Sequence, residues 1–238
     1  MPARTRARLP WQTILLEAFF VAFGVALALA ANEWRQARAD ARRAETALAG
    51  IREELRANRL NVLASVHYHI TTSDSLHAFQ QHAAPGAYPS PEIFRHGFVR
   101  PATLFETAWT TAVATDAISH MPYADVLALA RVYELQQSYH RQTEQVGQLI
   151  YARLFAEGFE GMIRNYTNFN TILSGFWYRE CQLLAGYHDV LSALGDAGGA
   201  PPDSIATPER CAYARTSARL TDAPAGRARA ASTSSTAP

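Results

Sequence analysis

Threonine, aspartate and histidine side chains gather in the middle of the chain, around a tryptophan. Hydroxyl, carboxylate and imidazole groups beside an aromatic ring are suited to bind a small polar ligand. The residues that could form such a groove are Thr107, Trp109, Thr111, Asp116, His120 and His140. Asp116 and His120 are four residues apart, which would place them on one face of a helix. The sequence offers them no third ligand or nucleophile, so we assign no catalytic role, and the plainer interpretation makes Trp109 a core residue.

His67, His69, His77 and His82 also lie close together in the sequence. Metal-binding pairs on a helix are three or four residues apart, whereas His67 and His69 are two apart and point to different sides. Asp74 with His77 is the nearby pair with suitable spacing. We expect exposed or hydrogen-bonded histidines, and neither a metal nor a cofactor. The sequence contains no P-loop, Rossmann, HExxH or EF-hand pattern, so no catalytic residue is predicted.

The chain is organised around the apolar run of residues 13–31, TILLEAFFVAFGVALALAA. As a helix it would span about 28 Å, close to the ~30 Å hydrocarbon core of a bilayer. A basic tail of residues 1–12 precedes it, and Trp11 and Trp34 flank it, as is typical of a membrane-spanning helix. We predict a single-pass membrane protein whose domain lies outside the cytoplasm.

A cleaved signal peptide is the alternative interpretation of this run. The tail is basic, the run is apolar, and Ala26-Leu27-Ala28 or Ala28-Leu29-Ala30 could serve as a cleavage site. Glu17 within the run, and the lack of a helix-breaking residue before either site, favour retention. A secreted soluble domain remains the open alternative.

Glu17 is the one charged residue in the apolar run, and a carboxylate inside lipid is costly. Small residues around it would let a second helix approach closely. The predicted contact between membrane helices consists of Glu17, Ala18, Ala22, Gly24, Ala26 and Ala28. We expect a homo-oligomer or docking on a partner membrane protein, with Glu17 hydrogen-bonded at the contact.

Two segments, LLEAFFVAFGVALALAANEWRQAR and FETAWTTAVATDAISHMP, resemble a family of uncharacterised bacterial single-pass inner-membrane proteins. That family has an N-terminal span of the form E-x-x-x-V-x-x-G-V-x-x-A-L, then a tryptophan and a charged helix. The matching residues are Glu17, Val21, Gly24, Val25, Ala28, Leu29 and Trp34. Asp116 departs from the pattern, which has a small residue there. The resemblance covers the first 60 residues or so and the domain loosely. It implies a bacterial inner-membrane location and an all-helical domain of unknown activity.

Composition limits the class of protein. The chain has 238 residues with a formal net charge of +1, which argues against nucleic acid as a partner. Alanine, leucine, arginine and glutamate recur with helical spacing, so we predict an all-α protein. Cys181 and Cys211 could form a disulfide in an oxidising compartment or stay as free thiols.

The remaining residues divide into a long helix, a connection, a bundle and a tail. Residues 32–83 form a juxtamembrane helix with a heptad seam, and residues 84–102 a proline-rich connection with a turn at Pro91–Phe94. Residues 103–194 supply about three further helices of a bundle, the first opened by a Thr103–Glu106 capping box and ending near His120. Residues 195–238 are predicted to be disordered.

These patterns favour a membrane-anchored interaction, scaffold or sensory protein that associates through its small-residue span. A ligand-binding or enzymatic helical domain is the second hypothesis, and it would use the threonine, aspartate and histidine groups of the groove.

Overall fold

One helix dominates the computed structural model, which describes residues 11–196 and 210–211. The elements are α1 (Trp11–His82), η1 (Pro91–Phe94), α2 (Thr107–Ala114), η2 (Ala117–His120), α3 (Tyr123–Arg164) and α4 (Tyr166–Ala193). The described part of the chain contains no strand. The fold is therefore all-α, as the helical spacing of the sequence predicted. The basic tail up to residue 10 and most of the predicted C-terminal tail lie outside the described residues.

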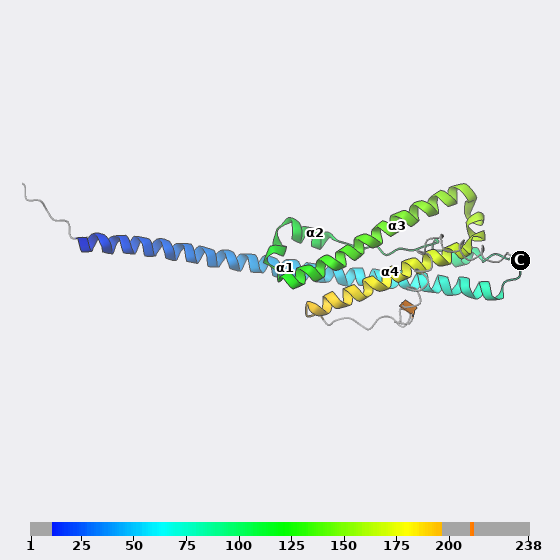
Figure 1. The fold of residues 1–238 in the computed structure, drawn as a ribbon, viewed down its shortest axis with the longest axis horizontal. Helices are drawn as coiled ribbons and strands as arrows, with labels where there is room; N and C mark the ends of the chain where they lie inside the picture. The colour runs from blue at the N-terminus through cyan, green and yellow to red at the C-terminus, as the bar shows by residue number, and fades with distance from the viewer. Residues whose placement is uncertain (1–10, 197–209, 212–238) are drawn as a thin grey trace, which may run out of the picture.

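α1 runs without interruption through both the apolar run and the predicted juxtamembrane helix. It contains no proline, and its 72 residues extend about 110 Å. Its first part projects away from the rest of the molecule, and its second part lies within the bundle (Figure 1). The helix ends at His82, shortly before Pro85. Proline cannot continue the hydrogen-bond ladder, and it disfavours a helical conformation in the residue before it.

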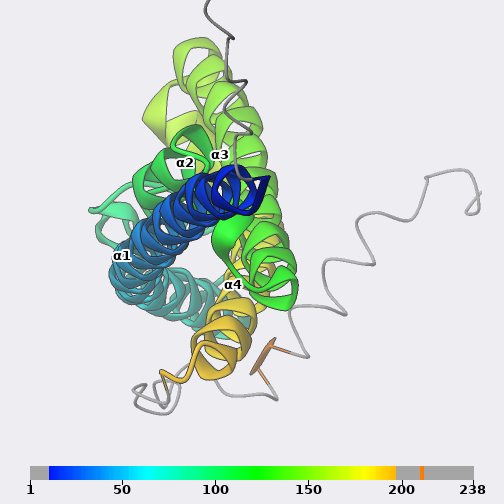
Figure 2. The same cartoon turned by 90° about the vertical axis from the view of Figure 1, so that its left-hand side faces the viewer.

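The bundle packs α4 along both α1 and α3, with α2 beside α1 (Figures 1 and 2). The heptad seam of α1 is buried within this one chain from Ala44 onward, through Ile51, Leu55 and Val62. The first residues of the predicted seam, Trp34, Ala37 and Ala41, are exposed in this single chain. There α1 has not yet reached the other helices.

A second core cluster fills the end of the bundle farthest from the apolar run. The predicted turn Pro91–Phe94 is the 3₁₀ helix η1, and its Ser90 accepts a hydrogen bond from the Glu92 N–H. η1 places Phe94 against Phe98 and Phe169, whose rings have centroids 4.5 Å apart. The proline-rich connection thus contributes Phe94 and Phe98 to a buried aromatic cluster.

Two boundaries differ from the sequence prediction. The Thr103–Glu106 capping box does not form: α2 begins only at Thr107, and its N-cap Glu106 makes no side-chain cap bond. The helix predicted to reach His120 is broken at Asp116, which adopts a left-handed conformation with φ of 56°. Gly158 interrupts α3 with φ of 69° and turns the chain toward α4.

We expect Leu55→Ala to lower the free energy of unfolding by about 2–5 kcal/mol, because Leu55 is fully buried and the smaller side chain leaves a cavity. Leu60 lies on the same helix and is 67% exposed, so Leu60→Ala should change stability by no more than about 0.5 kcal/mol. Denaturant unfolding of the full chain in detergent, followed by circular dichroism, measures both. Equal losses for the two variants would contradict the described packing.

Candidate functional site

The apolar part of α1 is exposed along its whole length. Among the described residues, α1 is the one helix long and apolar enough to cross a membrane, and none of its most apolar stretch is buried in the chain. The six residues of the predicted helix contact, Glu17 to Ala28, all lie on this exposed part. An exposed apolar helix of this length needs a lipid or protein environment.

Small and large side chains are separated around this part of α1. At about 100° per residue, one half of the helix surface carries mostly small or narrow groups and the other half bulky ones. The first half includes Glu17, Ala18, Val21, Ala22, Gly24, Ala26 and Ala28, together with the larger Ile14, Leu15 and Leu29. The second includes Leu16, Phe20, Phe23 and Leu27. A Cβ atom added at Gly24 would meet no atom within 4 Å, so the chain itself does not require glycine at this position.

An open groove of about 850 Å³ lies between α1, α2 and η2, just beyond the apolar run. Mostly small side chains line it: Ala39, Thr46, Ala47, Gly50, Thr107, Ala108, Thr111, Ala112, Thr115 and Ala117, with Arg42, Arg43 and Glu54. Thr107 and Thr111 of the predicted threonine groove are part of this lining. It is an open surface depression and not an enclosed pocket.

The other four predicted groove residues do not line it. Trp109 packs against the core and stacks on Tyr133 with ring centroids 5.1 Å apart, as its core interpretation predicted. Asp116 occupies the break between α2 and η2, so it shares no helical face with His120. The imidazole of His120 lies 4.0 Å from Asp40 on α1. His140 lies half-buried on α3. These groups form no common site.

The densest polar site is buried in the bundle, where α1 holds the connection that leads from η1 to α2. Five polar residues of α1, three or four positions apart, bond to this connection or to α2: Glu54, Asn58, Asn61, Ser65 and His69. Their partners are backbone groups between Arg100 and Ala108. Buried backbone groups outside regular secondary structure need such partners.

Asn58 pairs with the backbone of Phe105 in both directions. The Asn58 amide donates to the Phe105 carbonyl at 2.7 Å and accepts from the Phe105 N–H at 2.8 Å. It also donates to Gln136 of α3 at 3.1 Å. One turn earlier, Glu54 accepts hydrogen bonds from the Ala108 N–H and the Tyr133 hydroxyl, both at 2.7 Å. These contacts fix α2 and α3 against α1.

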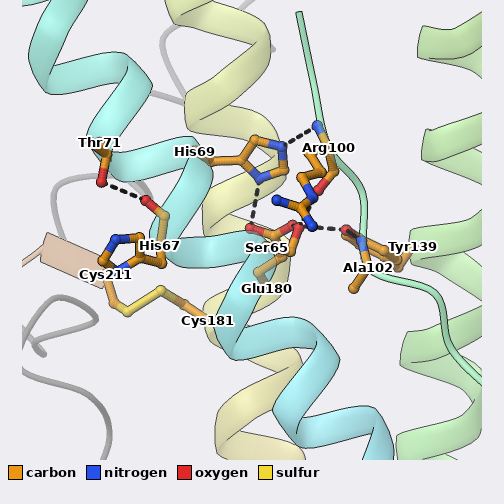
Figure 3. A network of polar contacts seen from close by, with 10 residues as sticks. All are labelled: Ser65, His67, His69, Thr71, Arg100, Ala102, Tyr139, Glu180, Cys181 and Cys211. Atoms are coloured by element: carbon orange, nitrogen blue, oxygen red, sulfur yellow. Dashed lines mark hydrogen bonds and ion pairs between the residues drawn. A yellow bond between two sulfur atoms is a disulfide. The ribbon is translucent and has the colours of Figure 1, made fainter. Parts of the chain in front are cut away.

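A second group of contacts surrounds Glu180 of α4 (Figure 3). Its carboxyl lies 2.5 Å from the Ser65 hydroxyl, 2.7 Å from the Tyr139 hydroxyl and 2.9 Å from Nδ1 of His69. Glu180 and His69 are both completely buried. The backbone N–H of Arg100 donates to Nε2 of His69, and that of Ala102 donates to the Tyr139 oxygen. We call these groups the Glu180 network.

The Glu180 network resembles a catalytic arrangement in composition but not in access. A serine, a histidine and a glutamate meet, yet Ser65 contacts Glu180 and not the imidazole. Nε2 of His69, the atom a base would use, already accepts the Arg100 N–H. All three side chains are buried, so the network is a structural clamp.

No pattern in the sequence predicted this network. Gln136 of α3, which joins Asn58, is also buried. A signal was present: Asn58 lies within the apolar seam, and Ser65 and His69 continue its spacing. Their partners come from distant parts of the chain, which no local pattern identifies.

Cys181 and Cys211 form a disulfide with an S–S distance of 2.02 Å. The disulfide decides between the two possibilities that the sequence left open, a disulfide and two free thiols. Arg210 adds an ion pair of 3.0 Å to Asp74 of α1. Residues 210–211 are thus attached to α4 and α1, unlike the disordered tail that the composition had predicted at these two positions.

Comparison of the chain with protein-family models, curated proteins and solved structures gave no match.

Three buried tyrosines should remain neutral in strong alkali. Burial raises the pKa of Tyr133, Tyr139 and Tyr187 well above the ordinary value, and nearby carboxyls add to the rise. In the unfolded chain they ionise near pH 10. The unfolded state then releases protons that the folded state keeps, so this stabilising contribution is present below about pH 10 and is lost as the pH rises further.

Tyrosinate absorbance measures this directly. Of the 10 tyrosines, three should ionise only when the chain unfolds, and the free energy of unfolding should fall with pH above about 10. A titration in guanidinium supplies the unfolded control. Ionisation of all tyrosines while the helical signal stays intact would contradict the burial of these hydroxyls.

Proposed function

We propose that the chain is a membrane-anchored helical interaction protein that associates with other membrane helices through the small-residue half of α1. The observation that carries this proposal is the exposed apolar stretch of α1 and its unbroken continuation into the bundle core. In lipid, apolar surface alone gives no preference for a partner helix, so close backbone approach and polar contacts drive association. Gly24 and the alanines beside Glu17 provide both.

Retention of the apolar run is part of this proposal. A continuous helix through Ala26–Ala30 leaves no extended segment at either candidate cleavage site. Trp34 follows the run, with the Arg38 guanidinium 4.7 Å above its ring, an arrangement suited to the interface between lipid and water. A secreted soluble domain would lose the exposed stretch that motivates the proposal.

The proposed location is a bacterial inner membrane with the bundle on the periplasmic side. The Cys181–Cys211 disulfide supports an oxidising compartment for the bundle. The bacterial origin and the membrane family rest on the sequence resemblance alone.

A ligand-binding role is the second candidate. It is favoured by the groove between α1 and α2, where Thr107 and Thr111 face small residues. The groove is open, and the other predicted polar groups lie elsewhere, so this role ranks below association.

Gly24→Leu tests the association proposal. The new side chain meets open space within its own chain, so the fold should be unchanged, whereas a close helix contact in lipid would be blocked. We expect association to weaken by about tenfold or more, equivalent to ~1.4 kcal/mol. Crosslinking in membranes, or energy transfer between labelled chains in liposomes, measures it.

Phe20→Leu is the matched control, because Phe20 lies on the bulky half of the same helix and the change keeps the run apolar. It should leave association unchanged. A native chain that is monomeric in membranes and recovers no partner membrane protein would refute the proposal.

A further inference from the structure

The groove between α1, α2 and η2 extends along α1. Its α1 residues run from Ala39 to Glu54, which is about 22 Å of helix. α2 and η2 follow it in the opposite direction, since the Ala108 N–H donates to Glu54, whereas His120 lies 4.0 Å from Asp40. The hydrocarbon part of one lipid leaflet is about 15 Å thick, half of the bilayer core. The groove is therefore long enough to hold one acyl chain along its length.

Most of this length presents apolar groups. Alanines and Gly50 make up much of the lining. The hydroxyls of Thr46 and Thr115 donate to carbonyls one turn earlier, at 2.9 Å to Arg42 and 2.8 Å to Thr111. These two threonines have thus already used their one hydroxyl hydrogen. The lining suits a hydrocarbon chain better than a ligand that needs hydrogen-bond donors.

Charged groups of opposite sign lie at the two ends of the groove. Arg42 and Arg43 lie at the end nearer the apolar run, and Glu54 lies at the other. Arg43 pairs with Asp40 at 2.8 Å, and the two Glu54 oxygens each accept a hydrogen bond. Within the described part of the chain, the guanidinium of Arg42 is exposed and forms no ion pair. A guanidinium binds a carboxylate through two parallel hydrogen bonds, so an anionic head group fits at Arg42 and would be repelled at Glu54.

The Arg42 end of the groove lies close to the expected membrane surface. Trp34 follows the apolar run as an interfacial residue, and the groove begins at Ala39, about 7.5 Å farther along α1. This distance is roughly the thickness of one lipid headgroup layer. An amphiphile in the adjacent leaflet is thus within reach of the groove.

We propose that the groove binds a long-chain fatty acid, with its carboxylate on Arg42 and its chain pointing away from the membrane toward Glu54. One guanidinium matches one carboxylate, and the lining covers one chain, whereas a phospholipid has two. Delivery of the ligand rests on the membrane anchoring of the proposed function. The groove itself belongs to the bundle and does not depend on association through Gly24 and its neighbours.

Photolabelling of the full chain in phosphatidylcholine nanodiscs tests this site. The probe is palmitic acid with a photoreactive diazirine at the end of its chain, and mass spectrometry locates the labelled residues. Fatty acid dissolved in the bilayer places its chain end beside residues 13–31. Fatty acid in the groove places it beside Gly50, Glu54 and Ala108, about 28 Å beyond the apolar run. We expect label at both places, and excess unlabelled palmitic acid should remove the groove label.

Gly50→Leu blocks the groove, and Gly50→Ala is its matched control. A Cβ atom at Gly50 would lie 3.9 Å from the Ala108 Cβ, an ordinary contact, so Gly50→Ala should fold and bind the probe as before. The longer leucine side chain should abolish the groove label and leave the label on residues 13–31 unchanged.

Arg42→Gln removes the charge that holds the carboxylate. Because this guanidinium is exposed, we expect the groove label to fall by about twofold to fivefold. Arg131→Gln is the matched control, because Arg131 is an exposed arginine of α3 outside the groove lining. It should leave the groove label unchanged.

Label confined to residues 13–31 would overturn the proposal and leave the membrane anchoring intact. Groove label that survives Gly50→Leu would also overturn it, as would equal groove label from a fatty alcohol or a lysophospholipid with the same photoreactive chain. No label at either place would refute both the site and the anchoring. Gly24→Leu should leave the groove label unchanged, so failure of the proposed association is distinguishable from failure of this site.

Discussion

The backbone hydrogen-bond ladder of α1 is the constraint on which the rest of the structure depends. An α-helix satisfies its own polar backbone, so it can pass from an apolar to an aqueous environment without unpaired groups. α1 uses this property over 72 residues, exposing its apolar first part and burying the seam of its second part in the bundle. The two parts are one continuous helix. A rotation or tilt of the apolar part would therefore move the helix around which the bundle is built.

The second constraint concerns the connection between η1 and α2, which runs along α1 without regular secondary structure. Its backbone groups are paired by polar side chains of α1, including Asn58, Ser65 and His69. Apolar side chains at these positions would leave buried N–H and C=O groups unpaired, at about 1–3 kcal/mol for each group. The polar residues of α1 thus specify the path of the connection, while the apolar seam supplies most of the burial.

The sequence predicted the features that depend on local patterns. The apolar run, the long helix after it, the turn at Pro91–Phe94 and the last helix each follow from periodicity or from proline, and the structure contains all four. The break at Asp116 was missed, because the alanines on either side of it suit a helix. The Glu180 network was missed for another reason. Its members come from residues 65 to 180, and only the tertiary fold brings them together.

Spin labels on α1 test its continuity most directly. Ala37→Cys and Ala78→Cys place labels at two exposed positions, and both native cysteines are engaged in the disulfide. For an unbroken helix in lipid bilayers, a pulsed dipolar measurement should give one narrow distance distribution centred near about 60 Å. A broad or much shorter distribution would show that α1 bends between the apolar run and the bundle, and would contradict the account.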